Sequence, residues 1–425
     1  MKYTFIITRF ALILGIISSL TLFACSDEFT GMVDSEKFVK PADDSEDNGE
    51  VEAPHKMNIR VFQADEEGYH SYRIPSLTRA PNGNLIALAE GRKRSSLDYG
   101  DIDIVYKVST DEGESWSALM PLLVEGEGTW GNPTILTDEE NGRIWLFVSW
   151  NDENHSQHGG RFEGKDYPAV SEWGDRRVFA TYSDDNGTSW SEPADLTEEL
   201  VPKTFVWDAV GPGNGIQVKQ GPTKGRLIIP AGERNIYSDD HGQTWHFQSL
   251  PLGTFESAVV ELSNGLLMRN DRAVSSYWRL SKTRHVATGS IESGFSDFTG
   301  DRNLIDPRNQ ASIYRLSFNP SVLVFLNPAR NDGDELVNRC NMTVRLSYDE
   351  GQTWKDSREL TYDGVEQADL CTLGYGGYTS LTAIDETTIG ALVEHNTTPV
   401  GGAAATRYFS VDFHKFNTSW VQNQE

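Results

Sequence analysis

The sequence predicts an all-β fold, a six-bladed β-propeller, and three observations support this prediction. An eight-residue turn motif occurs four times, its copies lie one or two repeat lengths apart, and short strand-like segments surround them with little sustained helical periodicity. The 38 glycines and 17 prolines suit a chain of many short strands and turns, and the 11 Trp, 15 Tyr and 19 Phe allow a substantial core.

The repeated motif reads S-x-D-x-G-x-[ST]-W and has the chemistry of a hairpin turn. Its Asp can accept backbone N–H groups, its Gly can adopt a positive φ, and its Trp can pack beneath the turn. The motif therefore identifies the fold and not a binding site. The four copies start at Ser109, Ser183, Ser238 and Ser347.

The spacing of the motif indicates the size of the repeating unit. The starts are separated by 74, 55 and 109 residues, and the last interval is close to twice 55, as if one unit had lost its motif. Strand-like runs flank the turns, for example residues 143–149 and 226–229. Such units match the four-stranded blade of a propeller, and roughly 370 residues allow about six of them. A solenoid is the competing architecture, but its repeats are usually shorter and more regular.

The N-terminus has the pattern of a lipoprotein signal peptide. Two basic residues precede an apolar run over 10–23, which is too short to span a bilayer comfortably. The run ends in L-F-A-C, which resembles a bacterial lipobox and implies cleavage before Cys25 and acylation of its sulfur. We expect residues 1–24 to be the signal peptide and the mature protein to lie in the bacterial cell envelope, on a membrane face that the sequence leaves open. Plain secretion and an uncleaved anchor are the alternatives.

The segment 25–56 is acidic and nearly free of aromatic residues. Such a segment cannot bury enough apolar surface to offset the entropy lost on ordering, so we expect a disordered tether. Residues 57–425 then form a single propeller domain.

The charge and the cysteines limit the possible partners. A formal net charge of −26 argues against nucleic acid or an anionic membrane surface, so membrane attachment is expected only through the lipid on Cys25. Three cysteines are too few for a disulfide framework. Cys340 and Cys371 either pair in an oxidising compartment or stay as two thiols. We expect a monomer.

Several segments resemble the exo-α-sialidase (neuraminidase) family, in which the repeated turn is called the Asp box. Y-R-I-P over 72–75 is similar to the [FY]-R-I-P motif near the start of sialidase catalytic domains. The resemblance covers essentially all of 57–425 and leaves no room for a separate lectin domain. The further segments that carry it are 90–92, 97–103, 255–265, 270–272, 338–339, 377–381 and 391–394.

The resemblance implies that Arg73, Arg272 and Arg339 bind the carboxylate that distinguishes sialic acid from other sugars. Guanidinium groups are always charged and match a carboxylate with paired N–H donors. Glu394 is expected to hold Arg73, because converging cations need a carboxylate to limit their repulsion. Arg92 is expected at the rim of the substrate or near its carboxylate. Cations focused in one concave site would allow a chain of net charge −26 to bind an anionic sugar. For any single arginine, a surface ion pair is the ordinary alternative.

The resemblance also implies three catalytic residues. A carboxylate nucleophile would face the negative charge of the substrate, and sialidases use a tyrosine instead, here Tyr378. Its pKa of about 10 requires a base, and Glu256 is the candidate. Asp98 is the expected general acid, and its reference pKa of about 3.9 requires burial or a nearby anion to raise it. Taken alone, Asp98 could be a turn aspartate and Glu256 a strand carboxylate.

No cofactor and no metal are expected. His155 and His158 lack further ligands nearby in the sequence, and the glycine-rich segment 211–215 lacks the Lys-Ser/Thr of a phosphate loop. Trp207 and Asp208 are weaker candidates for lining the pocket.

The function expected from the resemblance is hydrolysis of terminal α-ketosidically linked sialic acids from glycans and glycoproteins, with retention of configuration. A trans-sialidase or an intramolecular trans-sialidase would use the same residues. A propeller that only binds glycans would be expected to lack Tyr378, Glu256 or Asp98, and all three are present.

Overall fold

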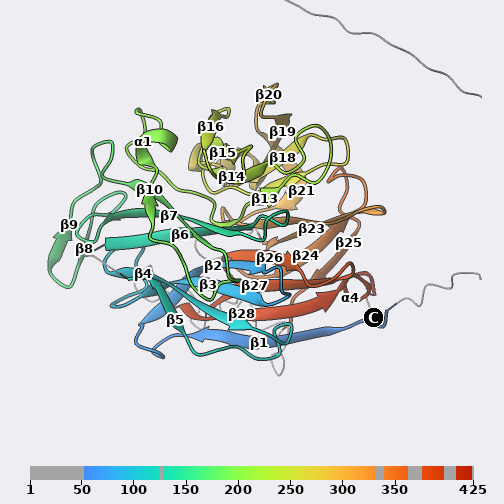
Figure 1. The fold of residues 1–425 in the computed structure, drawn as a ribbon, viewed down its shortest axis with the longest axis horizontal. Helices are drawn as coiled ribbons and strands as arrows, with labels where there is room; N and C mark the ends of the chain where they lie inside the picture. Colours follow the sequence, from blue (N-terminus) through green and yellow to red (C-terminus); the bar gives the residue numbers. More distant parts are fainter. Residues whose placement is uncertain (1–51, 125–127, 331–338, 362–375, 397–407, 424–425) are drawn as a thin grey trace, which may run out of the picture. The chain divides into compact units, whose positions relative to one another are not determined.

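The computed structural model describes residues 52–124, 128–330, 339–361, 376–396 and 408–423. In these residues the chain forms short antiparallel strands in separate sheets, with three short helices (Figure 1). The arrangement is an all-β, propeller-like one, in which four sheets of four or five strands act as blades. The predicted signal peptide and most of the predicted tether lie outside the described residues. The helices are α1 (Thr197–Leu200), α2 (Ser275–Ser281) and α4 (Thr418–Gln422).

One sheet joins the two ends of the described chain. Its strand order is β1-β28-β27-β26, and β1 pairs antiparallel with β28 along most of its length. The two strands run together along the lower edge of Figure 1. Pairing of the first strand with the last closes the arrangement, because it joins both ends of the described chain in one sheet. The strands are β1 (Lys56–Gln63), β26 (Thr379–Ala383), β27 (Thr388–Asn396) and β28 (Tyr408–Asn417).

Three further sheets are antiparallel meanders in which consecutive strands pair, except that β21 pairs with β19. Their cores lie between neighbouring sheets, as where Val344 and Leu346 of one sheet join Ile389 and Val393 of the next. The strands are β13 (Ile216–Gln217), β14 (Leu227–Ala231), β15 (Arg234–Ser238) and β16 (His246–Ser249); β17 (Val259–Glu261), β18 (Leu267–Asp271), β19 (Thr283–Ser290), β20 (Gly294–Phe295) and β21 (Thr299–Ile305); and β22 (Ser312–Phe318), β23 (Ser321–Pro328), β24 (Met342–Ser347) and β25 (Asp356–Glu359).

The remaining strands form one nine-stranded sheet and a small hairpin. Within the large sheet, β4 and β6 share a single parallel pair, Ile102 with Thr129. The strands are β2 (Ser71–Arg79), β3 (Leu85–Arg92), β4 (Ile102–Ser109), β5 (Met120–Leu123), β6 (Gly128–Thr137), β7 (Ile144–Asp152), β10 (Arg177–Ser183), β11 (Ala194–Asp195) and β12 (Gly213–Asn214), with β8 (Gly160–Phe162) and β9 (Lys165–Tyr167) in the hairpin.

The innermost strands meet around a common axis. Contacts run from β2 to β6, then to β13, β17, β22 and β26, and β26 contacts β2 again. All of these strands run in the same direction along the axis, because their C-terminal parts line one common cavity. Residues before or at the start of the innermost strands therefore gather at one end of the axis, and residues at their C-terminal ends gather at the other.

The first described residues of the chain lie at the second of these ends, where the innermost strands have their C-terminal ends. Glu52 accepts a hydrogen bond from the Thr387 hydroxyl, and Ala53 and His55 bond to Asn417. Thr387 immediately precedes β27, whose other end carries Glu394. Seven residues of strand span about 23 Å, so the entry point and Glu394 lie at opposite ends of the sheet.

Each repeated turn forms the hydrogen bonds that its sequence predicts. In the first copy Asp111 accepts from Ser109 Oγ at 2.7 Å, from the Ser115 N–H at 2.9 Å and from the Ser115 hydroxyl. The same pattern recurs at Asp185, Asp240 and Asp349.

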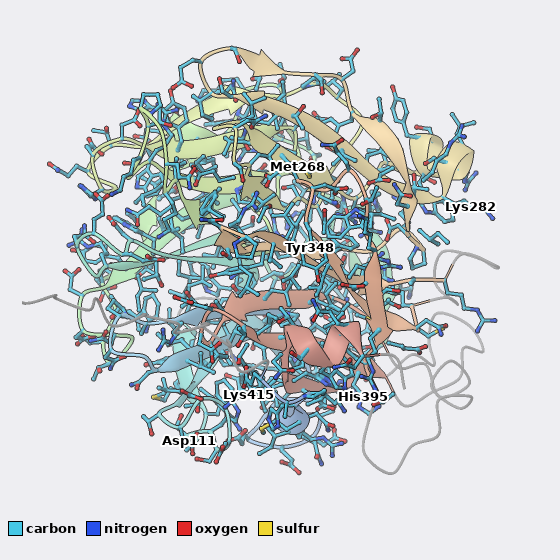
Figure 2. All side chains as sticks on the ribbon, turned by 90° about the vertical axis from the view of Figure 1, so that its right-hand side faces the viewer. Asp111, Met268, Lys282, Tyr348, His395 and Lys415 are labelled. Carbon is cyan, nitrogen blue, oxygen red and sulfur yellow. The ribbon has the colours of Figure 1, made fainter. Side chains whose placement is uncertain are left out.

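The structure adds a second role for these turns, which is contact with the preceding sheet. The residue before the motif glycine reaches a neighbouring turn or strand in all four copies. Glu112 pairs with Lys415, His241 contacts Asp138, and Glu350 accepts from the Ser263 hydroxyl, each in the preceding sheet. Asn186 accepts from the Asn82 N–H within the nine-stranded sheet. The glycine itself lies against the same neighbour, so that a Cβ on Gly242 would overlap the Trp145 ring. Figure 2 labels residues from two such junctions, Asp111 and Lys415 from one, and Met268 and Tyr348 from the other, where Met268 lies against Gly351.

Cys340 is disulfide-bonded, whereas Cys25 and Cys371 lie outside the described residues. None of the helices that the structure describes is long and apolar enough to cross a membrane.

Replacing Gly242 by Ala tests the contact between the turn and the preceding sheet. Gly242 (φ 82°) and Gly265 (φ 81°) share a backbone conformation, but no atom lies near a Cβ built on Gly265. We expect Gly265→Ala to cost about 1 kcal/mol, from backbone strain alone. Gly242→Ala should cost a further ~1–3 kcal/mol, because the methyl group overpacks against Trp145. Chemical denaturation of both variants measures the difference, and equal stabilities would contradict the proposed contact.

Candidate active site

The predicted site residues come from distant segments and meet at one end of the innermost strands. Arg73 lies near the start of β2, Glu256 precedes β17 and Tyr378 precedes β26. The strands that return to this end supply Arg92 at the end of β3, Arg272 after β18 and Glu394 near the end of β27. Asp98 lies in the turn between β3 and β4, and Arg339 precedes β24.

Glu394 is fully buried, and both of its oxygens are engaged. Oε1 accepts from Arg73 Nε at 3.2 Å and from the Ile74 N–H at 2.8 Å. Oε2 accepts from Arg73 Nη2 at 3.3 Å and from the Tyr378 N–H at 2.9 Å. One carboxylate therefore orients Arg73 and fixes the backbone of Tyr378.

The backbone beside Arg73 is irregular. Ile74 has a φ of 55°, and the pairing of β2 with β3 shifts register between Arg73 and Ser76. A β-branched residue in the left-handed region costs of order 1–3 kcal/mol unless its surroundings impose the conformation. The bond from the Ile74 N–H to Glu394 supplies such a constraint, and the bulge aims Arg73 towards the site.

The Tyr378 phenol lies between a carboxylate and a guanidinium. Its hydroxyl donates to Glu256 Oε1 and accepts from Arg272 Nη1 at 3.0 Å. Arg272 Nη1 also pairs with Glu256 Oε2 at 2.6 Å. The guanidiniums of Arg73 and Arg339 lie 5.1 and 5.5 Å from the centre of the Tyr378 ring.

Burial, followed by the negative charge of Glu256, raises the pKa of the Tyr378 phenol well above its ordinary value. The arginines around it oppose this rise but do not cancel it. The phenol is therefore protonated at rest, and its proton points at Glu256. A proton transfer along this hydrogen bond would generate a phenolate beside three cations.

Asp98 contacts two of the predicted arginines. Its carboxylate lies 2.8 Å from Arg73 Nη1 and 2.8 Å from Arg92 Nη1, although its side chain is 76% exposed. Desolvation raises the pKa of Asp98, but the positive charges of Arg92, Arg73 and Arg339 outweigh it, and the pKa lies well below its usual range. A general acid requires a raised pKa, but the pKa of Asp98 is lowered here because both ion pairs favour the carboxylate.

Arg92 is buried and pairs with Glu90 at 2.6 Å as well as with Asp98. Its Nη1 also donates to the Ser96 carbonyl at 2.6 Å. These contacts link Arg92 to the Asp98 turn, and its place at the rim of the substrate or near its carboxylate stays a prediction.

Three residues that contact the site were not predicted from the sequence. Glu90 lies two positions before Arg92, so that both side chains project from the same face of β3, and this spacing was a usable signal. Asn309 donates to the Gly377 carbonyl at 2.7 Å, and Gln310 bonds to both the N–H and the carbonyl of Thr379. These two amides hold the backbone on either side of Tyr378, and nothing in their local sequence indicates it.

The weaker candidates for the pocket lining or a metal site contact other side chains of the protein. Asp208 is buried in an ion pair with Arg234, and the Arg176 guanidinium lies 4.4 Å from the centre of the Trp207 ring. His155 lies beside Asp152. No group of three or more metal-ligating side chains comes together within the described ranges.

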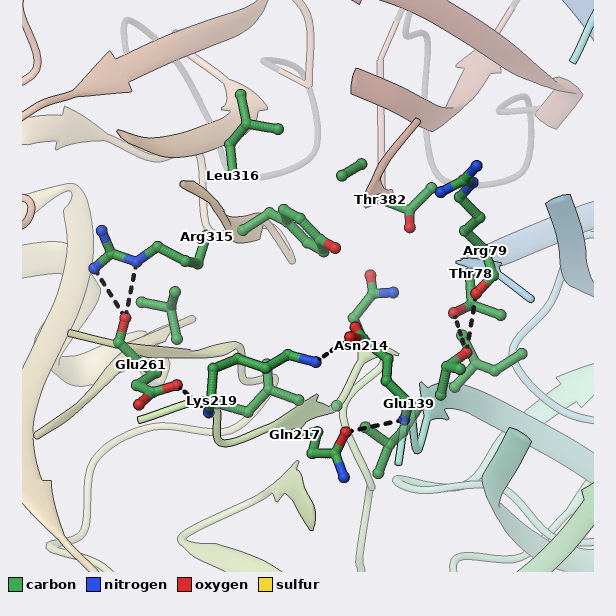
Figure 3. A pocket seen from close by; sticks show the side chains of 18 of the residues that line it. Thr78, Arg79, Glu139, Asn214, Gln217, Lys219, Glu261, Arg315, Leu316 and Thr382 are labelled. Carbon is green, nitrogen blue, oxygen red and sulfur yellow. Dashed lines mark hydrogen bonds and ion pairs between the residues drawn. The ribbon is translucent and has the colours of Figure 1, made fainter. Parts of the chain in front are cut away.

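A cavity of about 600 Å³ lies at the opposite end of the axis (Figure 3). It is lined by the C-terminal parts of the innermost strands, for example Thr78 of β2 and Thr382 of β26. Several of its polar side chains are paired, as Lys219 is with Glu139 and as Arg315 is with Glu350. The cavity is therefore separate from the predicted site residues.

Comparisons with known proteins find a family of BNR repeat-like domains, and relatives and solved structures that are sialidases. The model of the BNR repeat-like domain matches residues 83–369. An exo-alpha-sialidase from Aspergillus fumigatus is 38% identical over 386 residues, which cover 87% of this chain and 88% of that protein. Among solved structures, the Hadza microbial sialidase Hz136 aligns with a TM-score of 0.66 at 26% identity, over 86% of this chain and 69% of that one. A leech intramolecular trans-sialidase aligns with a TM-score of 0.69 over 87% and 71% of the two chains, but at 19% identity this likeness concerns the fold alone.

Replacing Glu394 by Gln tests whether one buried carboxylate organises the site. Both oxygens accept from two donors, so the amide NH₂ of Gln must face donors and leaves Arg73 without a charge partner. We expect a loss of about 3–5 kcal/mol in unfolding free energy. Glu292→Gln is the matched control, since Glu292 pairs with Arg226 but is 56% exposed, and it should cost at most ~1 kcal/mol. Similar thermal midpoints for the two variants would contradict this role of Glu394.

Proposed function

This chain belongs to the exo-α-sialidase family and is a glycoside hydrolase, and we propose that it removes terminal α-ketosidically linked sialic acids from glycans and glycoproteins with retention of configuration. The observation that best supports this proposal is the Tyr378 hydroxyl, which donates to Glu256 and accepts from Arg272. A phenol with a base on one side and a cation on the other is suited to become a nucleophile.

The arginines supply recognition. In this proposal Arg73, Arg272 and Arg339 bind the carboxylate on the anomeric carbon. Paired N–H donors and a permanent charge suit them to that group. Their placement around one tyrosine ring puts the substrate carboxylate next to the nucleophile, and the buried Glu394 limits the repulsion between converging cations.

The proposed reaction has two steps. In the first, the Tyr378 oxygen attacks the anomeric carbon while its proton passes to Glu256, and Asp98 protonates the leaving glycosidic oxygen. In the second, Asp98 takes a proton from water, which attacks the anomeric carbon, and Tyr378 leaves and recovers its proton from Glu256. Two inversions give net retention. A neutral phenol avoids the charge repulsion that an attacking carboxylate would meet at this anionic sugar.

We also propose that the propeller has six blades. The nine-stranded sheet then counts as two, β2-β3-β4-β5 and β6-β7-β10-β11, because a single residue pair joins β4 to β6. The six innermost strands that contact one another around the axis are in keeping with this count.

Two further parts of the proposal come from the sequence. The protein acts as a monomer, and it is held in the bacterial cell envelope by a lipid on Cys25, without contact to nucleic acid. Cys25→Ser should move the protein from the membrane fraction to the soluble fraction, because the lipid requires the cysteine sulfur. Fractionation of expressing cells measures this, with Ser45→Ala in the predicted tether as the matched control. Retention of the Cys25 variant in membranes would contradict the anchor.

Tyr378→Phe and Glu256→Ala test the catalytic assignment. Each should lower kcat on a sialic acid aryl glycoside by roughly 10³-fold or more, because the nucleophile or its base is removed. Tyr314→Phe is the matched control, since Tyr314 lines the cavity at the far end of the axis and its loss should leave kcat unchanged. Thermal unfolding checks that all variants fold, and wild-type turnover in either site variant would refute the assignment.

Time-resolved NMR of a sialoglycan digest distinguishes the alternatives of the reaction. Retention predicts that the α-anomer of free sialic acid appears first. A product transferred to an acceptor sugar, or an anhydro sugar, would instead identify a trans-sialidase or an intramolecular trans-sialidase.

A further inference from the structure

Asp98 occupies part of the surface that the proposed substrate needs. Glu394 engages Nε and Nη2 of Arg73, and Nη1 donates to Asp98. An incoming carboxylate must approach Arg73 from the Nη1 end, because the opposite edge of the guanidinium is already used by a buried partner. Two carboxylates therefore compete for this end of Arg73.

Asp98 is the partner that can move. Its side chain is 76% exposed, whereas those of Arg73 and Arg92 are 5% and 2% exposed. The turn that carries Asp98 continues into Gly100, which has a φ of 105° and no atoms near a Cβ built on it. A small cavity is lined by Leu97 and Tyr99, on either side of Asp98. Buried ion pairs with Glu394 and Glu90 therefore fix the two arginines, whereas Asp98 lies on an exposed turn.

We propose that the carboxylate of the substrate displaces Asp98 from Arg73, and that this exchange converts Asp98 from an ion-pair partner into the proton donor for the leaving oxygen. The inference rests on the proposed function, because it takes an anionic sugar as the incoming ligand. Nothing is oxidised or reduced, and the proton comes from solvent as the substrate binds.

The electrostatic consequence has a definite sign. Before the exchange, Arg92, Arg73 and Arg339 hold the pKa of Asp98 well below its usual range. After it, the charge of Arg73 is neutralised by the substrate and a new anion lies near Asp98, and both changes raise the pKa. The other charged groups around the turn are present before and after the exchange, so they do not supply the change. They are Glu90 and Glu394 behind the arginines, and Lys93 with Asp101 and Asp103 on the turn itself.

The exchange links recognition to catalysis. A sugar that lacks the carboxylate would leave Asp98 paired and ionised, and an ionised Asp98 cannot protonate the leaving oxygen. Discrimination against neutral glycosides would then appear in kcat as well as in binding.

Proton uptake on binding tests the proposal without relying on turnover. The Tyr378→Phe protein is titrated by calorimetry with the methyl α-ketoside of N-acetylneuraminic acid, in buffers of different ionisation enthalpy, between pH 4 and pH 7. We expect uptake approaching one proton per bound ligand at the acidic end. The uptake should fall as the pH rises through the pKa of Asp98 in the complex.

Matched variants identify the group that takes the proton. Adding Asp98→Asn should abolish the uptake, whereas adding Asp101→Asn, an aspartate of the same turn paired with Lys93, should preserve it. The carboxamide analogue of the ligand should bind without uptake. Thermal unfolding checks that each variant is folded.

The outcomes separate this inference from the proposed function. Binding of the sugar without proton uptake, or with equal uptake in the Asp98→Asn protein, overturns the exchange and leaves the sialidase proposal intact. Failure of the Tyr378→Phe protein and of the wild type to bind the ketoside at all overturns both.

Discussion

The buried carboxylate of Glu394 is the interaction on which the rest of the site depends. It accepts from Arg73, from the backbone of Ile74 and from the backbone of Tyr378, which belong to the first and last innermost strands. These strands, β2 and β26, become neighbours only when the ring of sheets closes. The contacts of Glu394 with Arg73 and with Tyr378 therefore require that the ring of sheets is closed. The left-handed backbone at Ile74 is stable in this context because its N–H donates a hydrogen bond to Glu394.

The fold class could be predicted from the sequence because the residues of the turn motif form hydrogen bonds with one another. Ser109, Asp111 and Ser115 interact within one turn, so their spacing is visible without tertiary information. The same cannot be said of the contacts between sheets. The residue before the motif glycine differs between copies, for example Glu112, His241 and Glu350, and so does its partner in the preceding sheet. Pairings between residues that lie tens or hundreds of positions apart have no local signature, and for this reason the docking role of the turns emerged only from the structure.

The same distinction between local and long-range contacts applies to the site residues. Two groups of side chains joined by hydrogen bonds and ion pairs meet at Tyr378, whose backbone N–H donates to Glu394. Resemblance led to all seven of their residues, which are Arg73, Arg92, Asp98 and Glu394 in one group and Glu256, Arg272 and Tyr378 in the other. Arg339 lies near the Tyr378 ring as well. What sequence reasoning could not supply was the state of each group. Asp98 was expected to have a raised pKa, but a pKa depends on which charges face the carboxyl, and the two arginines that face it come from β2 and β3. Asn309 and Gln310, which hold the backbone around Tyr378, act through main-chain bonds across about 70 residues and have no motif.

The route by which the polypeptide enters the propeller has a consequence for access. Glu52, Ala53 and His55 bond to Thr387 and Asn417, at the end of the axis remote from Glu394 and Tyr378. A group joined to the chain at Glu52 would therefore lie at the end of the axis that carries the cavity, and not at the end where Glu394 and Tyr378 meet.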